Sequence, residues 1–142
     1  MNTVIKSYKD LLNHELEDLF RLRQQVFIIE QECFYEDIDG YDEKAEHLLI
    51  YDQDILAAYL RIFKPGLKYN EASLGRIVVA PKYRGTGLGE KLIRKGIELC
   101  EGGSVRIEAQ SALLQYYNNL GFQEEGEIYP VDGIDHIQMV LP

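Results

Sequence analysis

VVAPKYRGTGLGEKLI, residues 78–93, is the stretch that decides the fold. It begins with β-branched and small residues typical of a strand, continues through a proline and three alternate glycines, and ends in an amphipathic segment. The first amides of a helix have no partner inside the helix, and glycine lets the backbone come close to a ligand. The stretch therefore predicts a strand, a loop that binds phosphate or pyrophosphate, and a helix.

The glycine spacing separates this loop from two common nucleotide-binding motifs. A Walker A loop needs GxxxxGK[ST] and a dinucleotide-binding fold needs GxGxxG, whereas Gly85, Gly87 and Gly89 form GxGxG. A strand-to-helix turn with no ligand is the alternative interpretation. An anionic ligand is favoured by the five basic side chains near the loop, which are Lys82, Arg84, Lys91, Arg94 and Lys95.

Composition limits the class of protein. The 142 residues are 46% hydrophobic and 27% charged, which predicts a single globular domain over residues 1–142. No apolar run is long enough for a membrane span and no secretory signal is evident, so we expect a cytoplasmic protein. A net charge of −9 disfavours binding to nucleic acid or to a membrane. Cys33 and Cys100 have no metal-ligand spacing, so we expect neither a metal site nor a disulfide.

Residues 30–46 are strongly acidic, with eight carboxylates and one lysine. Such a segment can attract a cationic ligand, or it can be a solvated surface without a ligand.

Hydrophobic periodicity predicts an α+β fold with a mixed, mostly antiparallel sheet. The pattern in 73–80 turns Arg76, Val78 and Ala80 to one face of a strand. The last helix is expected to begin at Ser111 as its N-cap. The expected elements are a helix over 14–30, a hairpin over 46–64 that turns at 52–54, a strand over 73–80, a helix from 88 to about 101, a strand over 104–110, a short helix over 111–121, and paired strands over 122–129 and 136–141.

Two of these stretches carry a family resemblance. RGTGLG (84–89) matches the R/Q-x-x-G-x-G/A signature of the GNAT superfamily of acetyl-CoA-dependent N-acyltransferases, and ALLQYYNNLGF (112–122) resembles that family's downstream helix. The acidic segment within 22–48 and DGIDHIQM (132–139) are similar to the ElaA-like subgroup. The resemblance implies the GNAT fold, in which two sheet strands splay into a V.

The resemblance also implies where acetyl-CoA binds as the co-substrate. Its pantetheine arm would pair with the strand around 77–79, and its pyrophosphate would meet the loop amides. Many relatives bind the arm with an asparagine where this chain has Gln110-Ser111. The implied coenzyme-binding residues are Ile77, Val78, Val79, Arg84, Gly85, Thr86, Gly87, Leu88, Gly89 and Asn118.

The same resemblance assigns catalytic roles. Tyr117 matches the family's general acid, and a phenol with a pKa of about 10 can protonate a leaving thiolate. Alternatively, Tyr116 and Tyr117 only pack. The amide of Val79 is expected to polarise the thioester carbonyl. Candidate bases for the attacking amine are Glu30, Asp39, Glu108 and His136, of which we select Glu30 and His136.

All four candidate bases have other interpretations, and Glu30 and Asp39 can equally bind the cationic substrate. Pairing with Arg76 or Arg61 is the preferred interpretation of Glu108, and a structural role is the alternative for His136.

We expect the acetyl group to pass directly to a primary amine, without an acyl-enzyme intermediate. Asp37, Asp39 and Asp42 are predicted to rim the acceptor entrance and favour a small cationic amine or a lysine or N-terminal amine of a peptide. The alternatives are a non-catalytic acyl-CoA-binding module and a structural domain without a ligand. Exposed strand edges also allow a homodimer.

Overall fold

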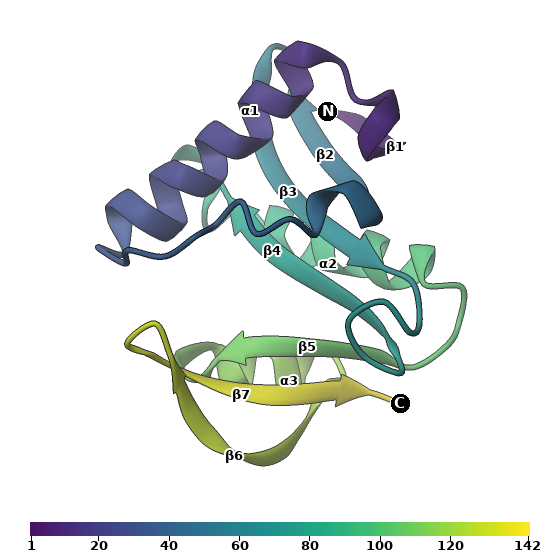
Figure 1. Ribbon diagram of the computed structural model, residues 1–142, viewed down its shortest axis with the longest axis vertical. Coiled ribbons are helices and arrows are strands. Elements are labelled where there is room, and N and C mark those ends of the chain that lie inside the picture. Colours follow the sequence, from purple (N-terminus) through teal and green to yellow (C-terminus); the bar gives the residue numbers. More distant parts are fainter.

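The alternating and amphipathic segments form one sheet with helices on both faces, and the computed structural model describes every residue of the chain (Figure 1). The strands are β1 (Asn2–Ser7), β2 (Glu46–Asp52), β3 (Ile55–Phe63), β4 (Ala72–Val79), β5 (Val105–Gln110), β6 (Gln123–Val131) and β7 (Ile134–Leu141). The α-helices are α1 (Asn13–Arg23), α2 (Leu88–Leu99) and α3 (Leu114–Asn119).

The strand order is β1-β2-β3-β4-β5-β7-β6, and every neighbouring pair is antiparallel except β4 and β5. These two parallel strands pair only at Ala72 with Val105 and at Ser73 with Arg106, after which they separate. The predicted mixed sheet with a splay between two strands is therefore confirmed. The predicted hairpin is also present, because β2 and β3 pair around the turn at Gln53 and Asp54.

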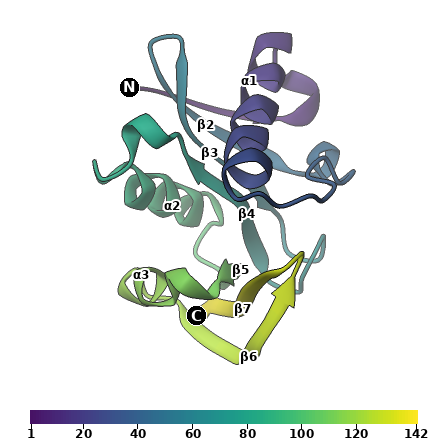
Figure 2. The ribbon, with the colours of Figure 1, turned by 90° about the vertical axis from the view of Figure 1, so that its left-hand side faces the viewer.

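Each face of the sheet has its own apolar core. Figure 2 shows α1 on one face and α2 on the other. Leu19 and Leu22 of α1 pack on Leu49 and Tyr59. On the other face, α2 and α3 cover the larger core, to which they contribute Leu92, Ile93, Tyr117 and Leu120. No helix is both long and apolar enough to cross a membrane.

The first predicted helix has two parts. The α-helix ends at Arg23, and a π-helical turn, η2 (Gln24–Glu30), continues it. A π-turn takes an extra residue per turn and so changes the direction of the side chains that follow it. It keeps Val26 in the core and leaves Glu30 exposed at the end of the turn.

Three details differ from the sequence predictions. Ser111 does not cap α3, because the helix begins with a 3₁₀ turn, η5 (Ser111–Leu113), that has no side-chain cap. The regular alternation predicted for 73–80 breaks at Arg76, which has a φ of 50° where the register with β3 shifts. Strand β1, which has no strong periodicity in the sequence, adds to the edge of the sheet.

Candidate acyl-transfer site

A cleft of about 660 Å³ opens where β4 leaves β5. Its walls come from these two strands, from η2 and the loop that follows it, and from the turn between β6 and β7. Among the predicted coenzyme residues, Ile77, Val78 and Val79 of β4 line the cleft. Because β4 has no partner strand beyond Ser73 on this side, its backbone can pair with an extended ligand arm.

The bulge at Arg76 lies at the start of this open edge. A φ of 50° is uncommon for a residue with a side chain, and bulges often occur beside active sites. Here the bulge directs the Arg76 guanidinium toward the acidic loop, where Nε lies 2.7 Å from Oδ1 of Asp37. The strand that borders the cleft is thus joined to the loop that forms the opposite wall.

The glycine loop connects the end of β4 to α2. None of the amides from Gly85 to Glu90 donates to a backbone carbonyl, and the N-cap residue Gly87 makes no side-chain cap. Thr86 supports the loop, since its Oγ1 donates to the carbonyl of Tyr83 at 2.6 Å. Leu88 is buried in the core, so only its amide is available to a ligand. These free amides lie at the positive end of the α2 dipole and can donate hydrogen bonds to a phosphate group.

The three glycines meet different requirements. Gly85 and Gly87 have φ values of 76° and 85°, in the left-handed region that favours glycine. A Cβ on Gly89 would instead meet the Tyr116 hydroxyl at 3.0 Å. Tyr116 therefore packs on the first turn of α2, while its neighbour Tyr117 points into the core.

We expect Gly87→Ala to destabilise the fold by about 1 kcal/mol, because a left-handed conformation costs a side chain roughly that much. No neighbouring atom lies within 4 Å of the added Cβ, so the whole cost is conformational. Urea unfolding measures the change. Gly103→Ala, which has ordinary φ and contacts nothing closer than 3.9 Å, is the control and should stay within about 0.5 kcal/mol. Equal effects of the two changes would refute this account.

Arg84, predicted to bind the coenzyme, already has a partner. Its Nη1 and Nη2 donate to the two oxygens of Glu30 at 2.9 and 3.0 Å. Both side chains line the cleft and both are close to half exposed, at 45% and 44%. Of the other basic residues near the loop, Arg94 pairs with Glu90, whereas Lys82 makes no ion pair and lies over the ring of Tyr83. The Glu30 carboxylate thus holds the guanidinium at the edge of the cleft.

Tyr117 lines the cleft, and it is 5% exposed. Its ring packs edge-on against Phe122 and Tyr116, and no hydrogen bond to its hydroxyl is present. Burial raises the pKa of the Tyr117 phenol, and the neighbouring Tyr116 adds to this effect. The phenol therefore stays protonated at neutral pH and can act as a proton donor.

Asn118, also predicted to bind the coenzyme, is engaged at the end of α3. Its Nδ2 donates to the carbonyl of Phe122 at 2.9 Å and to Glu124 at 3.2 Å. The side chain is not among the residues that line the cleft. These bonds let Asn118 fix the turn after α3, and its contact with the coenzyme stays a prediction.

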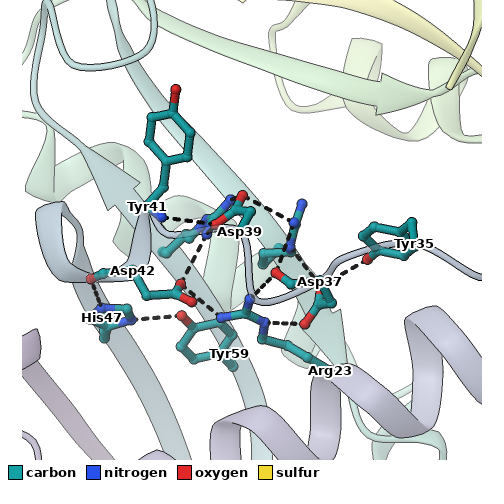
Figure 3. A network of polar contacts seen from close by, with 10 residues as sticks. Arg23, Tyr35, Asp37, Asp39, Tyr41, Asp42, His47 and Tyr59 are labelled. Atoms are coloured by element: carbon teal, nitrogen blue, oxygen red, sulfur yellow. Dashed lines mark hydrogen bonds and ion pairs between the residues drawn. The ribbon is translucent and has the colours of Figure 1, made fainter. Parts of the chain in front are cut away.

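The acidic segment is neutralised from within the protein (Figure 3). Arg23 donates to Asp37 at 2.7 Å and to Asp42 at 2.9 Å, and Arg61 bridges Asp42 and Asp39. Asp37 and Asp42 are 9% and 4% exposed, and neither lines the cleft. These carboxylates hold the loop through their arginine partners, and their contact with an acceptor stays a prediction. The charge count of the segment predicted an attractive rim because its arginine partners are distant in the sequence.

His47 belongs to the same network. Its Nδ1 lies 2.7 Å from the Tyr59 hydroxyl and its Nε2 lies 2.8 Å from the carbonyl of Asp42. Because a carbonyl only accepts, Nε2 carries the proton, and burial lowers the pKa of this ring. These contacts give His47 a structural role.

His136 lies on β7, at the point where this strand pairs with β5, and it lines the cleft. Its Nδ1 is 2.7 Å from the carbonyl of Ile134. Because a carbonyl only accepts, Nδ1 carries a proton, which in the neutral tautomer leaves the lone pair on Nε2. The geometry permits His136 to take a proton from a group bound in the cleft.

Glu108 does not form the predicted ion pair, because neither Arg76 nor Arg61 pairs with it. Instead its Oε2 accepts from the Tyr129 hydroxyl at 2.6 Å, and Gln138 donates to that hydroxyl at 2.7 Å. Burial and the bond to Glu108 raise the pKa of Tyr129 to about 12, so the hydroxyl remains a donor. Glu108 lines the cleft as a carboxylate without a cationic partner. Tyr129 and Gln138 carried no motif that would have identified them.

Comparison with known proteins gives consistent matches over nearly the whole chain. An acetyltransferase (GNAT) domain model matches residues 11–142. Protein ElaA of Escherichia coli is 36% identical over 138 residues, which cover 93% of this chain and 90% of that protein. A UPF0039 protein of Synechocystis is 35% identical over 139 residues, with 94% and 90% covered.

Solved structures agree with these matches. The crystal structure of Escherichia coli ElaA superposes with a TM-score of 0.92 at 34% identity, and each chain is fully covered. The structure of an acyl-CoA N-acyltransferase from Pseudomonas aeruginosa superposes with a TM-score of 0.94 at 33% identity, again over the full length of both chains.

Proposed function

Because the chain belongs to the GNAT acetyltransferase family, we propose that it transfers an acetyl group from acetyl-CoA directly to a primary amine. One observation carries the proposal: the unpaired edge of β4 leads to the uncapped glycine loop, and Tyr117 lines the same cleft. A ligand with an extended arm, a diphosphate and a thioester at its tip fits the β4 edge, the glycine loop and Tyr117.

The residues that would hold the coenzyme follow the cleft. Backbone groups of Ile77, Val78 and Val79 would pair with its arm, and the amides of the 85–89 loop would receive its pyrophosphate. The amide of Val79 would also polarise the thioester carbonyl. Arg84 would exchange Glu30 for a phosphate oxygen, since both are anionic acceptors for its guanidinium.

Proton transfer would use the two sides of the cleft. His136 would take the proton from the acceptor ammonium through Nε2, and the neutral amine would attack the thioester carbon. As the C–S bond breaks, Tyr117 would protonate the thiolate, and the proton that the acylated nitrogen then loses would restore the phenol. Glu30 is the weaker candidate for the base, because its carboxylate is paired with Arg84.

A thiol-release assay with acetyl-CoA and a panel of primary amines tests the proposed function. Release that depends on the acceptor supports it, with the acetylated product identified by mass spectrometry. Tight binding of acetyl-CoA without release from any amine would favour a non-catalytic acyl-CoA-binding module instead.

We expect Glu30→Gln to tighten coenzyme binding about threefold, because the phosphate then no longer competes with a carboxylate for Arg84. Calorimetric titration with CoA measures this change, and kcat should stay near the wild-type value. Glu32→Gln is the matched control, since Glu32 lies in the same acidic segment but makes no ion pair and does not line the cleft. A fall in kcat of a hundredfold or more in Glu30→Gln would instead identify Glu30 as the base.

A further inference from the structure

Four lysine or arginine side chains line the cleft, and one of them has no acidic partner. Arg61 pairs with Asp39 and Asp42, Arg76 with Asp37 and Asp39, and Arg84 with Glu30. Lys68, in the loop between β3 and β4, makes no ion pair.

Aromatic rings hold the Lys68 ammonium at the mouth of the cleft. Its Nζ lies 5.0 Å from the centre of the Tyr41 ring and 5.6 Å from that of Phe63. Lys68 as a whole is exposed, so a ligand can reach it. Partial desolvation of the ammonium lowers the pKa of Lys68, and the nearby charge of Arg61 adds to this effect. The aromatic faces attract the cation but leave its hydrogen-bond donors unused.

The opposite side of the cleft carries the complementary charge. The Glu108 carboxylate has only the Tyr129 hydroxyl as its partner, and its charge, after that of Asp39, favours the ammonium form of Lys68. Cross-strand register sets Gln138 opposite Glu108 and His136 opposite Gln110, so these side chains share one face of the sheet. The acceptor end of the cleft therefore has an anionic side next to His136 and a cationic side at Lys68.

We propose that Lys68 binds a carboxylate that the acceptor carries beside its amine, so that the acceptor is a free amino acid or a compound of that class. The inference rests on the proposed acyl transfer and names the substrate of that same site. The amine would face Glu108 and His136 while the carboxylate meets Lys68. A cleft of about 660 Å³ that must also admit the coenzyme arm favours such a small acceptor. A polyamine would leave Lys68 facing a second cation.

Matched pairs of acceptors test this proposal, each an amino acid and its amide, such as methionine and methioninamide. Wild type should favour the acid at least tenfold in kcat/KM, as expected for one charge-assisted hydrogen bond. Lys68→Met should remove the preference by raising KM for the acid alone, and Lys68→Arg should restore it. Lys44→Met is the control, because Lys44 also lies over the Tyr41 ring but outside the cleft. A preference that persists in Lys68→Met, or is absent from wild type, overturns the proposal.

A second measurement does not depend on turnover. Calorimetric titration compares N-acetylmethionine with N-acetylmethioninamide, which resemble the two products. Wild type should bind the acid about tenfold more tightly, and Lys68→Met should bind both equally. Equal binding to wild type, or no binding, rejects the role of Lys68 even if acetyl transfer occurs. A difference that depends on Lys68, together with no thiol release from any amine, rejects acetyl transfer while retaining the carboxylate site.

Discussion

Replacing Tyr117 with phenylalanine is expected to lower kcat by about 10²–10⁴-fold, the usual contribution of a positioned general acid. The phenylalanine keeps the edge-on packing against Phe122, and no hydrogen bond is lost because the hydroxyl has no partner. Stability and coenzyme affinity should therefore remain near wild type. Thiol release under saturating acetyl-CoA measures the effect on kcat, and calorimetry measures affinity.

Tyr116→Phe is the matched control for this change. Tyr116 is 39% exposed and its hydroxyl packs on Gly89 rather than lining the cleft. We expect kcat to change less than about threefold in this variant. If both variants keep full activity, solvent supplies the proton and the assignment of Tyr117 as general acid is wrong.

The largest effect on stability is expected for Arg23→Met, at about 3–5 kcal/mol. Arg23 is fully buried and donates to two carboxylates and to the carbonyl of Asp37. Methionine fills most of the same volume, but it leaves Asp37 and Asp42 as buried charges with fewer partners. Denaturant unfolding measures the loss, and Arg23→Lys should lose less because it keeps the charge.

Arg21→Met tests whether the loss of stability expected for Arg23→Met depends on the burial of the arginine. Arg21 is on the same helix, and its side chain is 62% exposed in a surface pair with Glu17. We expect a change within about 0.5 kcal/mol. A loss below about 1 kcal/mol in Arg23→Met would mean that water enters and solvates the two aspartates, and that the network does not hold the loop.

Local patterns in the sequence predicted most of the elements but not β1. The polar turn at 52–54 marked the β2–β3 hairpin, and the strand-glycine-helix order around Gly85 marked β4 and α2, whereas the splay was implied by the family resemblance. These features are local because each depends on residues within one element and its turn. The family motifs then placed Tyr117 on a short helix beside the cleft, although Ser111 was wrongly expected to cap it.

The electrostatic contacts could not be predicted in the same way. Arg23 lies 14 residues from Asp37, and Arg84 lies 54 residues from Glu30, so no spacing rule relates them. The expected pairing of Glu108 with Arg76 was wrong because the bulge turns Arg76 toward the acidic loop instead. A long side chain follows the local backbone direction, which a single irregular φ value can reverse.

The loop after η2 combines fixed and replaceable positions, and this division has an evolutionary consequence. Cys33 is held at the carbonyl of Asp132, and Asp37 is held by Arg23. Phe34, between these two anchors, is 90% exposed, and Ile38, directly after Asp37, is 63% exposed. Substitutions at such positions cost the fold little, so descendants of this protein can acquire new partners at the loop surface while the anchors preserve its shape.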